Sequence, residues 1–326
     1  MGVLYVTGKD SKVGKTTICA TLISLAQSND FTRISFLKPF VTNDKDKDSL
    51  IISKLCGIDE QVKSTKSKSQ AIKIIKQADL DNDLVIVEGS HNLNFEDHKE
   101  IVSSVDAKVI VVADFLSRRT KSIIEFSEGF EEYLLGIIVN NLTLYGNTRF
   151  EEVWQPAFDK SKADLLGTIP EDRTLVSLTV ESIANILNAY FYSGDEYKDN
   201  LVENFMVGGF GMDPGQYVFN TRNKKAVIVR GDRPDVQMSA LETPMSCFIM
   251  TNGLEPIEYV QYECEEEKVP VLIVQENTLT IMDMIDQLSK LSKFDHPKKL
   301  EKAKQLMVEN IKVEKIITTF GQLPLM

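Results

Sequence analysis

The chain of 326 residues is poor in the residues that build metal centres and disulfide frameworks, with four cysteines and three histidines. Cys19, Cys56, Cys247 and Cys264 share no metal-type spacing, so neither a zinc site nor a disulfide framework is expected. Apolar runs such as Val109 to Ala113 are far shorter than the roughly 20 residues that span a bilayer. The N-terminus also lacks the segments of a secretory signal, so we expect a cytoplasmic protein with no membrane partner.

Positive charge is scarce as well, because 37 Lys and Arg residues face 48 Asp and Glu residues, a formal net charge of −11. Nucleic-acid affinity comes from clustered Lys and Arg side chains that release counterions, so no nucleic-acid partner is expected. Hydrophobic residues make up 43% of the chain, an ordinary globular composition. The length exceeds the size at which one core usually stops growing, which favours two domains.

Short β-branched runs alternate with longer amphipathic stretches over the first 190 residues or so. This alternation is typical of βαβ units and predicts an α/β fold with a mainly parallel sheet. The expected strands are Val3 to Thr7, Ile34 to Leu37, Leu84 to Val87, Val109 to Ala113, Leu135 to Val139 and Leu165 to Ile169.

A polar break near residue 192 predicts a domain boundary. We expect a first domain over residues 1–191, a linker over 192–203, and a smaller α/β domain over 204–326 that includes a C-terminal helix. The expected elements of the second domain are strands Ala226 to Arg230, Cys247 to Met250 and Val269 to Val274, and helices Thr280 to Leu291 and Pro297 to Asn310.

The stretch "VTGKDSKVGKTT" joins the first strand to the first helix and is glycine-rich. In a phosphate loop, backbone N–H groups and a helix N-terminus converge on an anion. Lys15 offers a positive charge to the outer phosphates, and Thr16 a hydroxyl suited to Mg²⁺. The loop is one residue longer than the common pattern, because its first glycine is Gly8. The residues expected to bind the cofactor here are Gly8, Asp10, Ser11, Lys12, Val13, Gly14, Lys15, Thr16 and Thr17.

The longer loop resembles that of dethiobiotin synthetase and its relatives, whose pattern is G-x-D-[ST]-x-V-G-K-T. Three further motifs follow in the same order: Lys38-Pro39, Asp48, and Glu88-Gly89. The resemblance implies ATP and Mg²⁺ as cofactors, with Lys15 and Lys38 as catalytic residues and Thr16, Asp48 and Glu88 at the metal. It also implies that Asn140, at the end of a strand, recognises the adenine ring, although the neighbouring Asn141 leaves that assignment open.

Elementary chemistry supports the same role at the metal for these acidic residues. Side chains at the carboxyl ends of parallel strands lie where such sheets bind ligands, and Mg²⁺ prefers hard oxygen ligands. The alternatives are structural: Glu88 as a simple strand end, Asp48 in a solvated turn, and Lys38 as a surface lysine before a proline. His91 is expected to be a polar lining residue and not a catalyst.

The second half resembles a different small α/β domain, called DRTGG, in the segments Gly231 to Asp235, Thr251 to Pro256 and Val269 to Val274. Asn252 replaces the first glycine of the motif. This domain follows a dethiobiotin-synthetase-like domain in the N-terminal portion of some bacterial phosphate acetyltransferases. The resemblance implies a sensing or assembly role and a homo-oligomer, and no acetyltransferase catalytic domain is expected.

Two functions therefore stay open. One is a regulatory protein that binds ATP and Mg²⁺ and turns it over slowly or not at all. The other is an ATP-dependent ligase or synthetase that transfers the γ-phosphoryl group to a carboxylate or carbamate of a small molecule. The partners expected are a nucleotide and a small-molecule effector or substrate.

Overall fold

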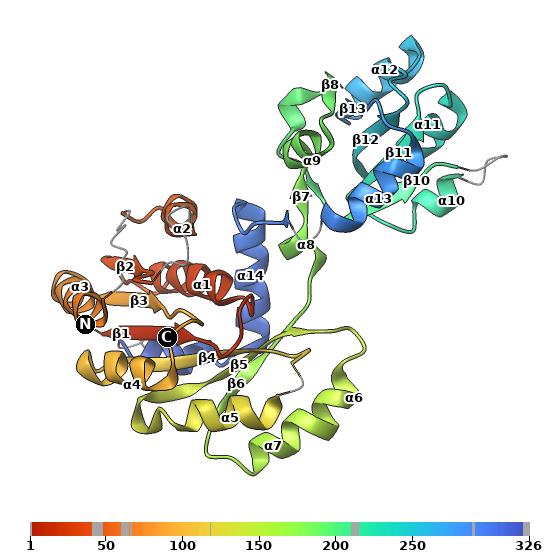
Figure 1. The fold of residues 1–326 in the computed structure, drawn as a ribbon. Coiled ribbons are helices and arrows are strands. Elements are labelled where there is room, and N and C mark those ends of the chain that lie inside the picture. Colours follow the sequence, from red (N-terminus) through yellow and green to blue (C-terminus); the bar gives the residue numbers. More distant parts are fainter. Residues whose placement is uncertain are drawn as a thin grey trace. The chain divides into compact units, whose positions relative to one another are not determined.

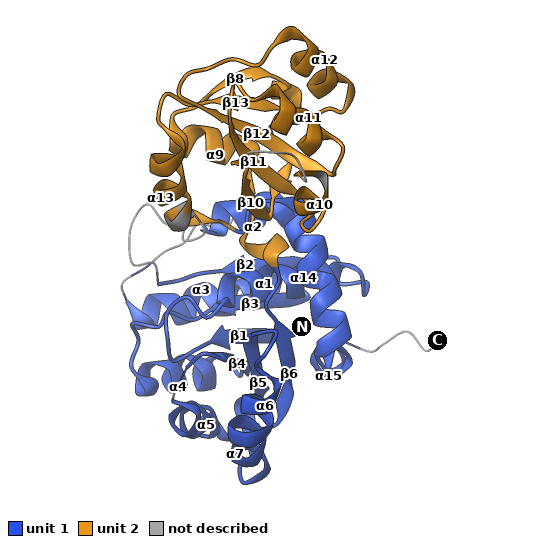
Figure 2. Ribbon diagram, turned by 90° about the vertical axis from the view of Figure 1, so that its right-hand side faces the viewer, with its two compact units in different colours: residues 1–172, 294–326 blue, residues 173–293 orange. Residues whose placement is uncertain are grey.

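The chain folds into two units, each with its own β-sheet. The computed structural model describes residues 2–40, 48–59, 65, 67–117, 119–209, 215–288 and 291–321. Unit 1 comprises residues 1–172 and 294–326, and unit 2 comprises residues 173–293 (Figure 2). The last stretch of chain thus belongs to the same unit as the first.

The sheet of unit 1 has six strands in the order β2-β3-β1-β4-β5-β6, and every neighbouring pair is parallel. The mainly parallel α/β sheet predicted from the sequence is confirmed. The strands are β1 (Val3–Thr7), β2 (Ile34–Leu37), β3 (Leu84–Glu88), β4 (Lys108–Asp114), β5 (Leu134–Leu142) and β6 (Leu165–Pro170).

Helices cover both faces of this sheet: α1 and α14 lie on one face, and α4 and α5 on the other (Figure 1). The strands are buried almost throughout, as expected for a parallel sheet enclosed between helices. None of the helices in the described residues has the length and apolar character needed to cross a membrane. The helices of unit 1 are α1 (Lys15–Gln27), α2 (Asp48–Cys56), α3 (Lys68–Asp81), α4 (Phe95–Ser104), α5 (Thr120–Glu128), α6 (Asn147–Arg149), α7 (Gln155–Asp159), α14 (Pro297–Asn310) and α15 (Val313–Thr318).

The end of α14 pairs with the edge strand β6. Ile311 forms an antiparallel bridge with Gly167, and the Lys312 N–H donates to the Leu166 carbonyl over 2.8 Å. Gly167 has φ of +148°, and a Cβ there would lie 2.0 Å from the backbone oxygen of Asn310. Only glycine permits this approach, and the contact covers a sheet edge that would otherwise be open.

Unit 2 contains a five-stranded sheet in the order β10-β11-β12-β13-β8, in which β8 alone is antiparallel to its neighbour. Side chains alternate between two cores: Ile228 faces one and Val227 the other. The strands are β7 (Leu178–Thr179), β8 (Tyr190–Ser193), β9 (Leu201–Val202), β10 (Asn204–Val207), β11 (Lys225–Arg230), β12 (Met245–Thr251) and β13 (Val271–Ile273). The helices are α8 (Arg173–Val176), α9 (Val180–Leu187), α10 (Gly215–Phe219), α11 (Pro234–Leu241), α12 (Glu258–Glu266) and α13 (Thr278–Leu288).

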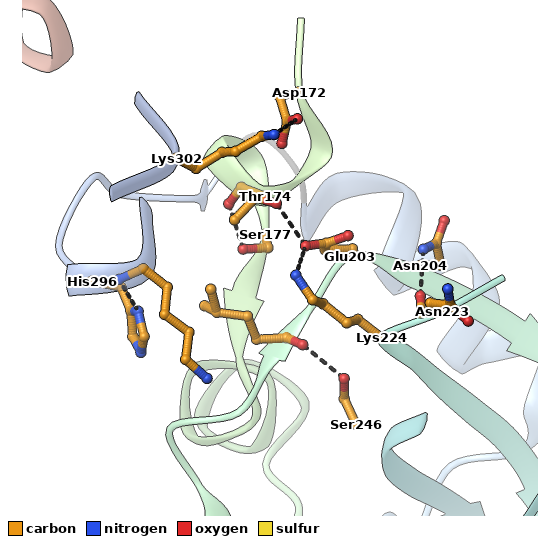
Figure 3. A network of polar contacts seen from close by, with 12 residues as sticks. Asp172, Thr174, Ser177, Glu203, Asn204, Asn223, Lys224, Ser246, His296 and Lys302 are labelled. Carbon is orange, nitrogen blue, oxygen red and sulfur yellow. Dashed lines mark hydrogen bonds and ion pairs between the residues drawn. The ribbon is translucent and has the colours of Figure 1, made fainter. Parts of the chain in front are cut away.

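Polar contacts fix the beginning of unit 2 (Figure 3). The carboxylate of Glu203 accepts from the Thr174 hydroxyl over 2.7 Å and from the Lys224 ammonium over 2.8 Å. Nearby, the Asn204 amide donates to the Asn223 carbonyl over 2.8 Å. These bonds hold α8 against the segment that leads into β10.

This division differs from the boundaries predicted from the sequence. Helix 297–310 has the expected bounds, but it lies in unit 1 and not in the second domain. The segment 192–203, expected to be a linker, contains the end of β8 and the whole of β9. An amphipathic helix buries its apolar face against whichever unit offers a matching surface, and its sequence does not name that unit.

Candidate functional site

The glycine-rich loop joins β1 to α1 at the carboxyl edge of the sheet. Its backbone enters the left-handed region at Lys12 (φ +58°) and at Gly14 (φ +93°). A Cβ at Gly8 would lie 2.5 Å from the carbonyl oxygen of Val112, so the loop begins in close contact with β4. Turns of this kind direct successive N–H groups toward an anion.

A cavity of about 550 Å³ opens beside this loop. It collects side chains that follow β1, β2 and β3, which are neighbours in the sheet. Its lining consists of Ser11, Lys12, Val13, Gly14, Lys15, Thr16, Thr17, Lys38, Phe40, Asp48, Glu88, Gly89, Ser90 and His91.

Thr16 and Glu88 meet at the floor of the cavity. Glu88 is the last residue of β3 and pairs in register with Val6 of β1, so its carboxylate lies next to the start of α1. The Thr16 hydroxyl donates to Oε2 of Glu88 over 2.9 Å. Glu88 is only 5% exposed. The strand end predicted from the sequence therefore carries a buried carboxylate in contact with the loop.

Lys38 follows β2 and bridges the two acidic residues predicted at the metal. Its Nζ lies 2.5 Å from Oδ2 of Asp48 and 3.6 Å from Oε1 of Glu88. Because β2 is the neighbour of β3, the ammonium and the carboxylate leave the sheet side by side. The structure thus brings Lys38, Asp48 and Glu88 together.

Burial shifts the pKa of two charged groups that line the cavity, Glu88 and Lys15. It raises the pKa of the Glu88 carboxyl, although Lys38, the Thr16 hydroxyl and Lys15 act in the opposite direction. It likewise lowers the pKa of Lys15, against the attraction of Glu88. In both cases burial destabilises the charged form of the group, because water no longer solvates it. A bound anion would favour the charged form of Lys15, and a cation that of Glu88.

The donors at the cavity suit Mg²⁺. Thr16, Asp48 and Glu88 offer hydroxyl and carboxylate oxygens, the ligand type that this ion prefers. Within the described residues, no three His, Cys, Asp or Glu side chains form a ready-made metal cage. Protein Mg²⁺ sites commonly use one or two carboxylates, and waters and phosphates complete the shell.

Three residues expected to contact the cofactor are not part of the lining: Gly8, Asp10 and Asn140. The Asp10 carboxylate lies 3.4 Å from the Arg119 guanidinium. The backbone carbonyl oxygen of Asp10 lies 3.4 Å from Nζ of Lys15. The Asn140 amide donates to the Val13 carbonyl over 2.9 Å.

Sequence reasoning missed part of the site. Phe40, Gly89 and Ser90 line the cavity, and so does His91, which the sequence predicts as a lining residue. Burial lowers the pKa of His91, and the positive charges of Lys15 and Lys38 lower it further. Gly89, Ser90 and His91 directly follow Glu88, so their position after a strand end was the available signal. Nothing in the sequence pairs Arg119 with Asp10.

The strand, the glycine-rich loop and the following helix define a phosphate-loop domain. A family model described as an AAA domain matches residues 3–179, more than half of the chain, so the protein belongs to that family. A second model, the DRTGG domain, matches residues 182–288. The phosphate-loop domain and the DRTGG domain expected from the sequence are thereby confirmed.

Several known proteins are similar to this chain at low sequence identity. Phosphate acetyltransferase of Synechocystis sp. is 27% identical over 113 residues, 35% of this chain, and the match spans 16% of that protein. MinD of Aquifex aeolicus, a cell division protein, is 17% identical, with a TM-score of 0.41 over 54% of this chain and 85% of its own. FtsY of Elizabethkingia anophelis, a signal recognition particle receptor solved with GDP, is 19% identical. Its TM-score is 0.41 over 52% of this chain and 57% of its own.

The CBS and DRTGG domains of a Clostridium perfringens pyrophosphatase, solved with the activator diadenosine tetraphosphate, are 16% identical to this chain. They have a TM-score of 0.31 over 49% of this chain and 82% of their own.

Proposed function

We propose that unit 1 binds ATP together with Mg²⁺ in the cavity beside Lys15, and that the protein is a cytoplasmic nucleotide-binding regulator. The observation that carries this proposal is the contact between the Thr16 hydroxyl and the Glu88 carboxylate directly after the phosphate loop. It places two hard oxygen donors next to the lysine that would bind the outer phosphates.

The residues divide the work between phosphate and metal. Loop N–H groups and the Lys15 ammonium would hold the phosphates. Burial disfavours the charged form of Lys15, and the negative charge of the phosphates would offset that effect. Thr16, Asp48 and Glu88 would hold Mg²⁺, which neutralises charge on the phosphate oxygens when it is bound. Lys38 would balance the two carboxylates and lie close to the outer phosphates.

The contacts made by the carboxylates of Asp48 and Glu88 favour a regulatory role. Among the described residues, the two carboxylates that line the cavity are engaged: Asp48 by Lys38, and Glu88 by Thr16 and Lys38. Neither is left uncommitted as a general base for a second substrate. Unit 2 would then report nucleotide occupancy, within a homo-oligomer.

A second candidate function is ATP-dependent phosphoryl transfer to a carboxylate or carbamate. It is favoured by the cavity lining outside the loop, which includes Lys38 together with Phe40, Ser90 and His91. An ammonium there could stabilise the charge that develops on a transferring phosphoryl group.

Calorimetric titration tests the proposal. The full chain is titrated with ATP, GTP and a non-hydrolysable ATP analogue, with and without Mg²⁺, and phosphate release from the ATP complex follows. Mg²⁺-dependent ATP binding with negligible turnover supports the regulator. Turnover that a carboxylic acid stimulates supports the second candidate. A chain that binds none of these nucleotides overturns both.

A further inference from the structure

Asn140 contacts the phosphate loop and does not line the cavity. Its amide nitrogen donates to the Val13 carbonyl over 2.9 Å, across 127 positions of sequence. We propose that Asn140 positions the phosphate loop, and that it governs binding of every triphosphate alike without discriminating between bases. This inference rests on the proposed nucleotide binding and assigns one residue its role there.

Asn140 is itself held in place. It lies near the end of β5, in register with Asp114 of β4, and its carbonyl accepts from the Phe115 N–H over 2.8 Å. β4 in turn pairs with β1, so the amide approaches the loop from a fixed position in the sheet. A hydrogen bond from such a support restricts the loop more than one from a mobile side chain would.

Gly14 shows how closely the amide approaches the loop. A Cβ at Gly14 would lie 2.3 Å from the Asn140 nitrogen, and Gly14 has φ of +93°. Position 14 therefore needs glycine for two reasons, one conformational and one steric. The second reason exists only because the Asn140 side chain occupies that space.

The loop is fixed at both ends. At its start, Gly8 lies against the Val112 carbonyl of β4, where a Cβ would be 2.5 Å away. Near its end, Val13 is 2% exposed and its carbonyl accepts the Asn140 bond. The Gly14 carbonyl then accepts the Ile18 N–H over 3.0 Å and begins the hydrogen bonding of α1. Releasing Val13 would free the turn whose N–H groups the phosphates need.

The test compares Asn140→Ala with Asn141→Gly. Asn141 is the adjacent residue and has φ of +60°, a conformation that glycine adopts without strain, so the control removes a neighbouring side chain at little cost. Each protein is titrated with ATP, GTP and inorganic tripolyphosphate in the presence of Mg²⁺. Thermal unfolding shows that each variant is folded. If Asn140→Ala does not fold, Asn140→Ser takes its place, because serine stays polar but is too short to reach Val13.

We expect Asn140→Ala to weaken all three ligands by a similar factor of about tenfold, the worth of one hydrogen bond to a buried group. The control should bind as the wild type does. A loss for ATP with unchanged tripolyphosphate would show that Asn140 recognises the base and would overturn the inference. Unchanged binding of all three would overturn it too.

Amide hydrogen exchange without ligand separates this inference from the proposed function. Asn140→Ala should exchange faster than wild type in peptides covering residues 8–18, and Asn141→Gly should not. Equal exchange in Asn140→Ala and wild type overturns the positioning role. If the wild type binds no triphosphate, the proposed function fails, and the exchange result alone decides the role of Asn140.

Discussion

Thr16 lies in the first turn of α1, and Glu88 ends β3; the Thr16 hydroxyl donates to the Glu88 carboxylate over 2.9 Å. The bond connects the loop to a neighbouring strand at the place where parallel sheets bind ligands. Lys15 and Lys38 supply the positive charges next to it. The predictions below begin from this group of side chains.

Replacing Lys15 should abolish tight nucleotide binding without unfolding the protein. In Lys15→Met the side chain keeps its length and loses its charge, so a buried charge-assisted contact to phosphate disappears. We expect affinity for ATP to fall about 100-fold. The matched control is Lys121→Met, whose side chain is 91% exposed. Calorimetry checks both, and an unchanged affinity in Lys15→Met would refute the phosphate-loop site.

Replacing Glu88 should change the effect of Mg²⁺. Glu88→Gln keeps an oxygen that accepts the Thr16 hydrogen bond but removes the charge that would attract the ion. We expect the gain in ATP affinity on adding Mg²⁺ to shrink about tenfold, and the Mg²⁺-free affinity to stay the same or rise. Glu125→Gln, at an exposed position, serves as control. Equal losses with and without Mg²⁺ would contradict a role at the metal.

His98 should make unit 1 sensitive to mild acid. It is 1% exposed, and its Nδ1 lies 2.8 Å from the Tyr5 hydroxyl. Burial, together with the smaller effect of the positive charge of Lys15, lowers the pKa of His98 from 6.5 to about 4. The unfolded chain then binds more protons than the folded one between these values, so stability falls as the pH falls through them.

The expected loss is about 3 kcal/mol of unfolding free energy across that window. Denaturant unfolding at a series of pH values measures it. His98→Gln has no such titration. The free energy of unfolding of the wild type, relative to that of His98→Gln, should therefore fall as the pH falls from 6.5 to 4. Parallel curves would show that His98 does not titrate as its burial requires.

Gly167→Ala should detach the C-terminal segment from β6. The new Cβ would lie 2.0 Å from the backbone oxygen of Asn310, which no side-chain rotation relieves. We expect a cost of about 2–3 kcal/mol and faster amide exchange around Ile311.

Gly57→Ala is the matched control for Gly167→Ala. Gly57 also has positive φ, +63°, but no atom of the described residues lies within 4 Å of its added Cβ. Only the backbone strain of about 1 kcal/mol should remain there. If the two variants were equally destabilised, the contact with Asn310 would contribute nothing.

Local pattern accounts for what the sequence predicted well. The run Leu84 to Val87 is apolar and β-branched, and it forms β3 with Glu88 as its last residue. Helix Pro297–Asn310 begins at its proline, which is preorganised for the first helical position. The glycine-rich loop was recognisable because every one of its parts is contiguous in sequence.

Contacts between distant segments could not be predicted in this way. Asn140 reaches Val13 because β4 lies between β1 and β5, and strand order is not encoded in any local pattern. The bridge between Ile311 and Gly167 likewise depends on which surface receives α14. Segment 192–203 has the composition of a linker, because its polar residues outweigh the apolar ones of its two short strand segments.

The pairing of Ile311 with β6 also sets an order of events during synthesis. Residues 173–293 leave the ribosome before residues 294–321, so unit 2 has all of its strands while unit 1 still lacks α14 and the cover on β6. Domains generally fold as units as they emerge. The edge strand β6 of the nascent unit 1 therefore stays uncovered until unit 2 and the C-terminal segment have been synthesised.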